Sequence, residues 1–225
     1  MFIYEMHQHT SPCSGCAKTT PEELIPAIKE AGFAGVVLTN HFHHGNTGID
    51  RGLPWEEFCK PYEDDYKRAL KIGNEIGVKV LFGIEEGIGK GKEVLIYGIT
   101  PDFMYDNPDM TTCSREELYN KVKSAGGVMI QAHPFRDRPY ITEPREIVNP
   151  EFLDGYEIFN RCNNPEDNDL AKEFYGNSGK IFTAGSDCHT AEFENRCGIE
   201  CDREIKDEKD LADILKSGNY KLYIP

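Results

Sequence analysis

The sequence predicts an α/β fold in which buried strands alternate with helices, closed into a barrel rather than left as an open sheet. Two observations carry this prediction. Short runs rich in Val, Ile, Phe and Tyr recur along the 225 residues, and segments with helical periodicity lie between most of them. Strands that alternate with helices are typical of parallel βα units. Their number favours a barrel, although the pattern alone does not separate a barrel from an open sheet.

The predicted strands are short apolar runs bounded by Gly, Asn or Pro. They cover residues 2–6, 34–39, 78–84, 93–99, 127–132, 155–159 and 180–185. Runs of this length and composition are typical of strands that are buried on both faces. The sequence therefore predicts a sheet with helices packed around it.

The predicted helices have recognisable first turns. Thr20 supplies a cap, Pro21 stands at the first helical position, and Glu23 completes a capping box. Ser114 and Glu117 form a second box at the start of another helix. Further helices are predicted over residues 55–76, 166–176 and 207–217. The length of the chain needs no more than one domain, and we expect residues 1–225 to form it.

Composition limits the class of protein. No apolar run approaches the roughly 20 residues that span a bilayer, and the first residues, MFIYEMHQHT, lack the features of a signal peptide. We therefore expect a cytoplasmic protein without a membrane partner. The 25 basic and 39 acidic residues give a net charge of −14. A chain with this charge repels polyanions, which argues against a broad nucleic-acid-binding face. A small anionic substrate stays compatible with it.

Eight cysteines do not indicate disulfides in a chain of this size without a secretory signal. Cys13 and Cys16 form one closely spaced pair, and Cys197 and Cys201 form another. Neither pair completes a zinc-ribbon spacing, so we interpret them as small, partly buried thiols. Cys13 is close to two histidines in the sequence, which leaves a ligand or redox role for it open.

Side chains that bind metal ions follow most of the predicted strands. They are His7, His9, His41, Glu85, Glu86, His133, Asp187 and His189, with Glu157 inside the run 155–159. The carboxyl ends of parallel strands share one rim, so we expect residues that are remote in sequence to meet there. Imidazole and carboxylate ligands suit Zn, Mn or Fe, and such a cluster is the apparatus of phosphate-ester hydrolysis. A deaminase or amidohydrolase commonly adds a lysine at a strand end, and these strand ends offer none.

Five segments in this order resemble the PHP family, the polymerase and histidinol phosphatase domains. The segments are MHQHT (6–10), LTNH (38–41), GIE (83–85), AHPF (132–135) and GSDCH (185–189). The resemblance covers most of the chain and implies a distorted (β/α)7 TIM-like barrel of the PHP type. It also implies two to three divalent metal ions (Zn, Mn or Fe) at the carboxyl rim.

The resemblance further implies which residues bind each ion. His7, His9, Glu85 and Asp187 would hold the first ion. Glu85 would bridge to a second ion, which His133 also binds, and His41 with His189 would hold a third. Glu85, Asp187 and His189 would act in catalysis, in which a metal-activated hydroxide attacks phosphorus.

The sequence departs from the family pattern at three positions. Relatives commonly have an aspartate ligand where this chain has Ser14, and a histidine near the fourth strand where it has Glu93. Glu93 could replace that histidine as an oxygen ligand of the second ion, whereas Ser14 is a poor ligand for the third. Asn40 stands where relatives often have Asp. We therefore predict at least two ions.

A phosphorylated substrate also needs cationic side chains. The candidates for substrate binding are Arg136, Arg161 and Arg196. The predicted function is that of a metal-dependent phosphoesterase that hydrolyses a phosphate monoester of a small metabolite, as a histidinol phosphatase does. A phosphodiesterase or nuclease and a phosphotyrosine phosphatase of the same superfamily are the alternatives. A catalytically inactive, metal-binding regulatory module is the alternative from another class.

Overall fold

A mixed sheet forms the centre of the molecule in the computed structural model, which describes residues 1–191 and 196–224. Its nine strands are hydrogen-bonded in the order β7-β6-β5-β4-β3-β2-β1-β8-β9. The strands are β1 (Phe2–Gln8), β2 (Gly35–Leu38), β3 (Lys79–Gly87), β4 (Glu93–Tyr97), β5 (Val128–Gln131), β6 (Gly155–Asn160), β7 (Ile181–Gly185), β8 (Gly198–Cys201) and β9 (Lys221–Tyr223). All seven predicted strands are confirmed, and β8 and β9 were not predicted.

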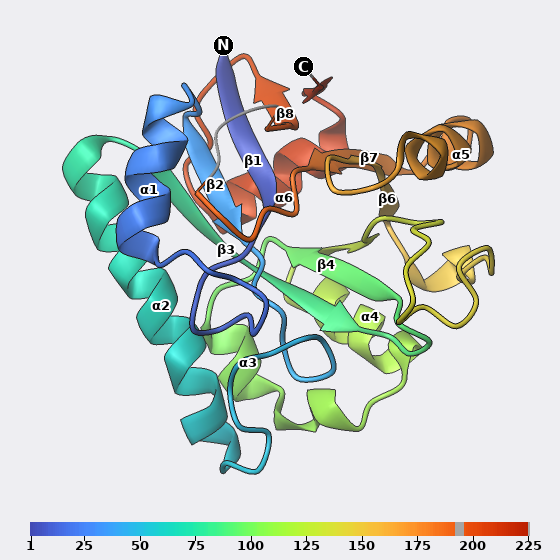
Figure 1. Cartoon of the computed structure of the whole chain (residues 1–225), viewed down its shortest axis with the longest axis horizontal. Coiled ribbons are helices and arrows are strands. Elements are labelled where there is room, and N and C mark those ends of the chain that lie inside the picture. Colours follow the sequence, from blue (N-terminus) through green and yellow to red (C-terminus); the bar gives the residue numbers. More distant parts are fainter. Residues whose placement is uncertain (192–195, 225) are drawn as a thin grey trace.

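The helices connect the strands and cover the sheet. They are α1 (Pro21–Glu30), α2 (Trp55–Ile76), α3 (Asp102–Asp106), α4 (Arg115–Ser124), α5 (Pro165–Tyr175) and α6 (Glu208–Ser217), with two short 3-10 turns, η1 (Pro108–Thr111) and η2 (Pro150–Phe152). The five predicted helices are confirmed, and α3 was not predicted. Figure 1 shows α1 and α2 along one flank of the sheet and α5 on the opposite side.

Capping groups fix the starts of two helices as the sequence predicts. The backbone N–H of Thr20 donates to Glu23 Oε2 at 2.9 Å. At the start of α4, the N–H of Glu117 donates to Ser114 Oγ at 3.2 Å, and the N–H of Ser114 donates to Glu117 Oε2 at 2.7 Å. These bonds satisfy donors that the first helical turn would otherwise leave without partners.

The sheet is not made of parallel βα units throughout. β1, β2 and β3 are parallel, and so are β5, β6 and β7, but β4 runs antiparallel to both of its neighbours. The expectation of uniform parallel units is therefore wrong at β4. Residues 88–92 between β3 and β4 are too few for a crossover helix and form a hairpin turn instead. Gly89 and Gly91 have φ values of 92° and 77° in that turn, a region that glycine adopts without strain.

The sheet curls so that its last parallel strand returns towards its first. Immediately after β7, the N–H of Asp187 donates to the carbonyl of His7 at 2.8 Å, and the N–H of His9 donates to the carbonyl of Cys188 at 3.3 Å. The result is a nearly closed, barrel-like sheet, as the predicted distorted barrel requires. The carboxyl ends of the parallel strands consequently lie together at one rim.

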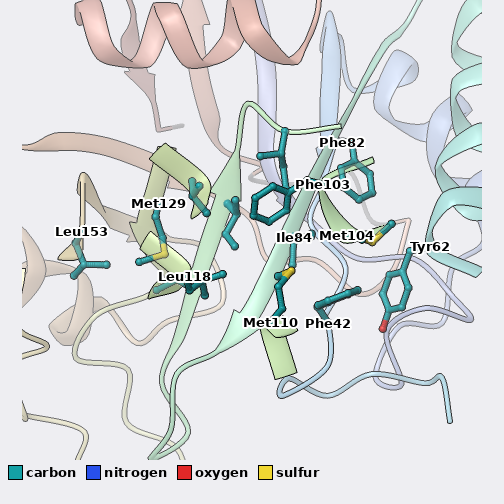
Figure 2. Close-up of a cluster of buried hydrophobic side chains, with 14 of the residues drawn as sticks. Phe42, Tyr62, Phe82, Ile84, Phe103, Met104, Met110, Leu118, Met129 and Leu153 are labelled. Carbon is teal, nitrogen blue, oxygen red and sulfur yellow. The ribbon is translucent and has the colours of Figure 1, made fainter. Parts of the chain in front are cut away.

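Buried apolar side chains hold this arrangement on both faces of the sheet. One cluster joins the strands to α6 through Leu81, Leu95, Ile130, Leu211 and Leu215. A second packs α1 and α2 against β2 and β3. The largest, drawn in part in Figure 2, includes Phe42, Phe82, Ile84 and Met129. Among the residues that the structure describes, no helix is long and apolar enough to cross a membrane.

We predict that Leu95→Ala lowers the free energy of unfolding by about 2–5 kcal/mol, because it leaves a cavity in the cluster between the strands and α6. Leu95 is fully buried, whereas Leu53 is 37% exposed, so Leu53→Ala serves as the control and should change stability by less than about 0.5 kcal/mol. Urea denaturation of the metal-free proteins measures both values. Equal effects of the two substitutions would contradict the assigned core.

Candidate metal centre

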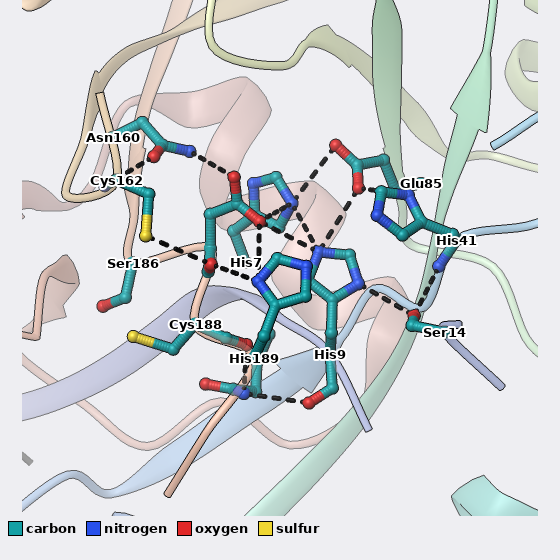
Figure 3. A network of polar contacts seen from close by, with 12 residues as sticks. His7, His9, Ser14, His41, Glu85, Asn160, Cys162, Ser186, Cys188 and His189 are labelled. Carbon is teal, nitrogen blue, oxygen red and sulfur yellow. Dashed lines mark hydrogen bonds and ion pairs between the residues drawn. The ribbon is translucent and has the colours of Figure 1, made fainter. Parts of the chain in front are cut away.

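The strand ends bring imidazole and carboxylate groups into one buried cluster (Figure 3). The donors are His7 on β1, His9 after β1, His41 after β2, Glu85 on β3, Glu93 on β4, His133 after β5, and Asp187 and His189 after β7. All of them except His133 form three overlapping groups in which the donor atoms lie within 4.8 Å of one another: His7, His9, Glu85 and Asp187; His41, Glu85 and Glu93; His9, His41 and His189. We call this set the donor cluster.

The first group has the geometry of a four-coordinate cation site. His7 Nε2 lies 3.1 Å from His9 Nε2 and 3.2 Å from Glu85 Oε1. Asp187 Oδ1 lies 3.1 Å from His9 Nε2 and 3.5 Å from His7 Nε2. A tetrahedral ion with ligands at about 2.0–2.2 Å separates neighbouring donors by about 3.3–3.6 Å. These four residues therefore surround a space of the right size for one divalent ion.

Glu85 extends the cluster to a second group with its other contacts. Its Oε2 lies 2.9 Å from His41 Nδ1, and its Oε1 lies 3.0 Å from His133 Nε2. Glu93 lies 3.2 Å from His41 Nδ1 and 3.5 Å from His133 Nε2. Because each oxygen of Glu85 faces donors of both groups, this carboxylate is placed to bridge two cations. Glu93 occupies the position at which an oxygen ligand of the second ion was predicted.

Two atoms of the cluster lack the hydrogen bonds that burial demands. His41 Nδ1 and Glu85 Oε2 have no hydrogen-bond partner among the residues that the structure describes, although they lie 2.9 Å apart. A buried polar atom without a partner costs free energy. A divalent cation would satisfy both atoms, so the donor set fits a bound metal. Nitrogen and carboxylate ligands agree with Zn, Mn or Fe.

His189 lies at the outer edge of the donor cluster. Its Nδ1 contacts the carbonyl oxygen of Asp187 at 2.9 Å, and its ring stacks on that of His9 with centroids 4.5 Å apart. Burial and the neighbouring imidazoles lower the pKa of His189 to about 4. A neutral imidazole at this place can accept a proton or bind a cation. The third group of donors thus consists of three histidines, without a carboxylate.

Charge keeps the two central carboxyl groups ionised. Burial would raise the pKa of Glu85, but the imidazoles of His7 and His41 outweigh it and hold that pKa well below its usual value. Burial likewise opposes ionisation of Asp187, but His7 and Arg136 hold its pKa well below the usual value of an aspartate. Ionised carboxylates are the form that binds cations.

Residues outside the donor cluster orient its imidazoles. Glu157 Oε1 contacts His7 Nδ1 at 2.9 Å, and its Oε2 accepts the backbone N–H of His133 at 2.9 Å. Ser14 Oγ contacts His9 Nδ1 at 3.0 Å. Carboxylates and hydroxyls in this position fix the tautomer of a metal-binding histidine. The sequence shows Glu157 as a charged residue in an apolar strand, but its contact with His7 could not be read from spacing.

The backbone at the rim is constrained where donors are presented. His133 and Asp187 have φ values of 29° and 53°, which are uncommon for residues with side chains. Gly185 precedes Asp187, and a Cβ at this position would lie 2.4 Å from both Glu157 Oε1 and His7 Cβ. The close approach of these side chains therefore requires glycine there. Backbone strain of this kind is typical of functional sites.

A cavity of about 1050 Å³ opens onto the donor cluster and includes His41, Glu93, Arg136, Asp187 and His189 in its wall. Arg136 is 7% exposed, donates to Asp187 Oδ2 at 2.6 Å, and is held by the side-chain oxygens of Asn160 and Asn163. Its charge therefore lies beside the donors. Further lining residues that were not predicted are Lys92, Arg115 and Tyr140.

The other two predicted arginines lie elsewhere. Arg161 donates to Cys188 Sγ at 3.2 Å. Arg196 is 2% exposed and donates to Gln8 Oε1 at 2.5 Å, with Glu5 Oε2 3.5 Å away. Within the described part of the chain, neither residue lines the cavity. Their predicted role in substrate binding therefore gains no support from their positions, because the partners of Arg196 lie inside the fold.

Residues 165–220 match the family model described as PHP-associated. This segment runs from α5 to the residues before β9 and includes Asp187 and His189. No curated protein sequence matches the chain. The family model therefore covers the C-terminal part of the predicted resemblance.

Three solved structures share the fold. A Bifidobacterium adolescentis protein, whose proposed activity is that of a metal-dependent phosphoesterase, is 17% identical with a TM-score of 0.56, and the match covers 95% of each chain. A two-domain Bacteroides vulgatus protein that contains a predicted PHP-like metal-dependent phosphoesterase is 13% identical with a TM-score of 0.70, and covers 99% of this chain and 64% of that one. The lesion-specific endonuclease Q of Pyrococcus furiosus is 12% identical with a TM-score of 0.68. The match covers 98% of this chain and 57% of the endonuclease.

The chain thus spans less than two thirds of the length of the last two proteins. Identities this low establish the architecture rather than a shared substrate. The family model and the solved structures confirm the resemblance that the ordered strand-end segments indicate: this chain has the fold of the PHP-like metal-dependent phosphoesterases.

Proposed function

We propose that the protein is a metal-dependent phosphatase that hydrolyses a phosphate monoester of a small anionic metabolite. One observation carries the proposal: four residues of the donor cluster share the wall of one cavity with the buried guanidinium of Arg136. These four are His41, Glu93, Asp187 and His189. Bound divalent ions would lower the pKa of a water molecule to about 7 and offset charge on the phosphoryl oxygens.

The residues of the chain supply the remaining parts of the chemistry. Glu85 would bind both ions, and its donor atoms lie within 4.8 Å of those of His9 and Asp187, which supports this role. The contacts of Arg136 with Asp187 and Asn160 hold its guanidinium beside the donors, where it can bind a phosphoryl oxygen. His189 lines the cavity and would move a proton to or from the reacting oxygens.

Size and charge support a small substrate. A cavity of about 1050 Å³ is at the upper end of the range of small-molecule sites. The net charge of −14 opposes the binding of a long polyanion. The fold similarity to an endonuclease keeps a phosphodiester substrate as the second candidate. The single-domain organisation and the cytoplasmic location stay predictions from the sequence.

We predict that the purified chain, tested with added Mn²⁺, Zn²⁺ or Fe²⁺, releases phosphate from small phosphomonoesters and loses this activity with a chelator. A panel that includes histidinol phosphate, a nucleotide diester, an abasic DNA duplex and a phosphotyrosine peptide measures the preference. Preference for the diester or the duplex would replace the proposal with a nuclease, and preference for the peptide with a phosphotyrosine phosphatase. Bound metal without hydrolysis of any substrate would indicate a regulatory module.

We predict that Arg136→Ala lowers kcat/KM for the preferred substrate by about 10²–10³-fold, because it removes a fixed positive charge from the phosphoryl site. Steady-state kinetics should be combined with metal analysis of the same sample, since Arg136 also contacts Asp187. Arg138→Ala is the matched control, because Arg138 belongs to the same loop and donates to the backbone carbonyls of Asp137 and Cys162. Unchanged kinetics in Arg136→Ala with full metal content would refute the assigned role.

A further inference from the structure

A buried carboxylate outside the donor cluster lies close to the end of β1. Asp65 is on α2 and is 1% exposed. Its Oδ2 accepts a hydrogen bond from Thr10 Oγ1 at 2.5 Å and another from Asn40 Nδ2 at 3.2 Å. A buried charge is costly unless its hydrogen bonds are satisfied. The other oxygen of Asp65, Oδ1, lies 3.5 Å from Arg68 Nη2 on the same helix, and the partners of Oδ2 lie next to His9 and His41.

The orientation of the Asn40 amide follows from its contacts. Its Oδ1 accepts the backbone N–H of Thr10 at 2.7 Å, and its Nδ2 donates to Thr10 Oγ1 at 2.8 Å as well as to Asp65. A backbone N–H can only donate, and an ionised carboxylate can only accept. The amide oxygen must therefore be the atom that faces Ser14.

The hydroxyl of Ser14 uses all of its hydrogen-bonding capacity. Its Oγ donates to Asn40 Oδ1 at 2.9 Å and accepts the backbone N–H of His41 at 3.0 Å. A hydroxyl has one hydrogen and two lone pairs. The second lone pair faces His9 Nδ1 at 3.0 Å, so this nitrogen must carry the proton and donate it.

Because Nδ1 donates to Ser14, Nε2 is the nitrogen of His9 that can present a lone pair to a cation. Nε2 faces the space of the first group, 3.1 Å from both His7 Nε2 and Asp187 Oδ1. A histidine binds a metal through an unprotonated nitrogen, and the hydrogen bond at its other nitrogen decides which one that is. Glu157 has the corresponding place beside His7 Nδ1.

We propose that Asp65, Asn40 and Ser14, here called the relay, are positioning residues that hold His9 in the tautomer that binds the first cation. Ser14 serves as the hydrogen-bond acceptor for His9 and is not itself a ligand. The inference rests on the proposed metal-dependent function, but it concerns cation binding and can be tested without a substrate.

The direct test measures the binding of Mn²⁺ or Zn²⁺ alone to the full chain by isothermal titration calorimetry, with metal analysis after dialysis. Ser14→Ala should weaken binding at the first group by about 10–100-fold. The second ion, whose predicted ligands are Glu85, Glu93 and His133, should stay bound. At limiting metal, Ser14→Ala should therefore bind one equivalent of cation less than the wild type. A general folding defect would instead remove both cations.

Asp65 tests whether the effect passes along the relay. Asp65→Ala removes the acceptor for Asn40 and Thr10 and should weaken the first cation in the same way, although less strongly than Ser14→Ala. Asp65→Asn keeps an acceptor oxygen of the same shape and should retain near wild-type affinity. Thr39→Val is the matched control, since Thr39 Oγ1 accepts the N–H of Gln8 at 3.0 Å and is fully buried, but lies outside the relay.

Unchanged cation affinity in Ser14→Ala would overturn the proposal, as would equal losses in Asp65→Asn and Asp65→Ala or simultaneous loss of both cations. Circular dichroism of each variant shows whether it is folded. The outcomes separate the two proposals. Cation binding that depends on Ser14 in a chain that hydrolyses no phosphate ester would support the relay and refute the phosphatase. Phosphatase activity in a chain whose cation affinity is unchanged by Ser14→Ala would support the phosphatase and refute the relay.

Discussion

The rest of this structure depends on one constraint: nitrogen and oxygen donors are buried within hydrogen-bond distance of one another. Imidazole and carboxylate groups from six strands converge in a space where they are at most 11% exposed, apart from His189. Hydrogen bonds among them leave His41 Nδ1 and Glu85 Oε2 unsatisfied within the described part of the chain. A bound divalent cation would satisfy both atoms and would offset the negative charge of the buried carboxylates.

The surrounding fold is arranged to hold these donors. His133 and Asp187 join the cluster from positions with positive φ values, and Gly185 leaves room for His7 and Glu157 to meet. Glu157 contacts one imidazole of β1, and Ser14 contacts the next. The nearly closed sheet matters because it returns the end of β7 to β1, so that Asp187 can complete the first group.

The sequence predicts the donors better than it predicts what holds them. His7, Glu85 and Asp187 could be found because each lies at or after the end of a short apolar run, and parallel strand ends share a rim. The direction of β4 was predicted wrongly, although the short connection between the predicted runs 78–84 and 93–99 already favours a hairpin over a crossover. The role of Ser14 could not be predicted, because it depends on Asp65 from a remote helix.

Burial explains the different positions of the arginines. Arg136 and Arg196 look alike in sequence, as each follows a donor on a loop. Only the folded chain shows that Arg136 lines the cavity while Arg196 is buried against Glu5 and Gln8. Such pairings involve residues that no local pattern connects. The sequence therefore limits the chemistry of the site, and tertiary contacts decide which charged groups can reach a substrate.

The most direct measurement is anomalous diffraction from crystals of the full chain grown with Mn²⁺ or Zn²⁺. The account predicts a peak about 2.0–2.2 Å from Nε2 of His7 and His9 and from the carboxylates of Glu85 and Asp187. It predicts a second peak between Glu85, Glu93 and His133. Clear density for these side chains at saturating metal, with no anomalous peak among them, would contradict the account.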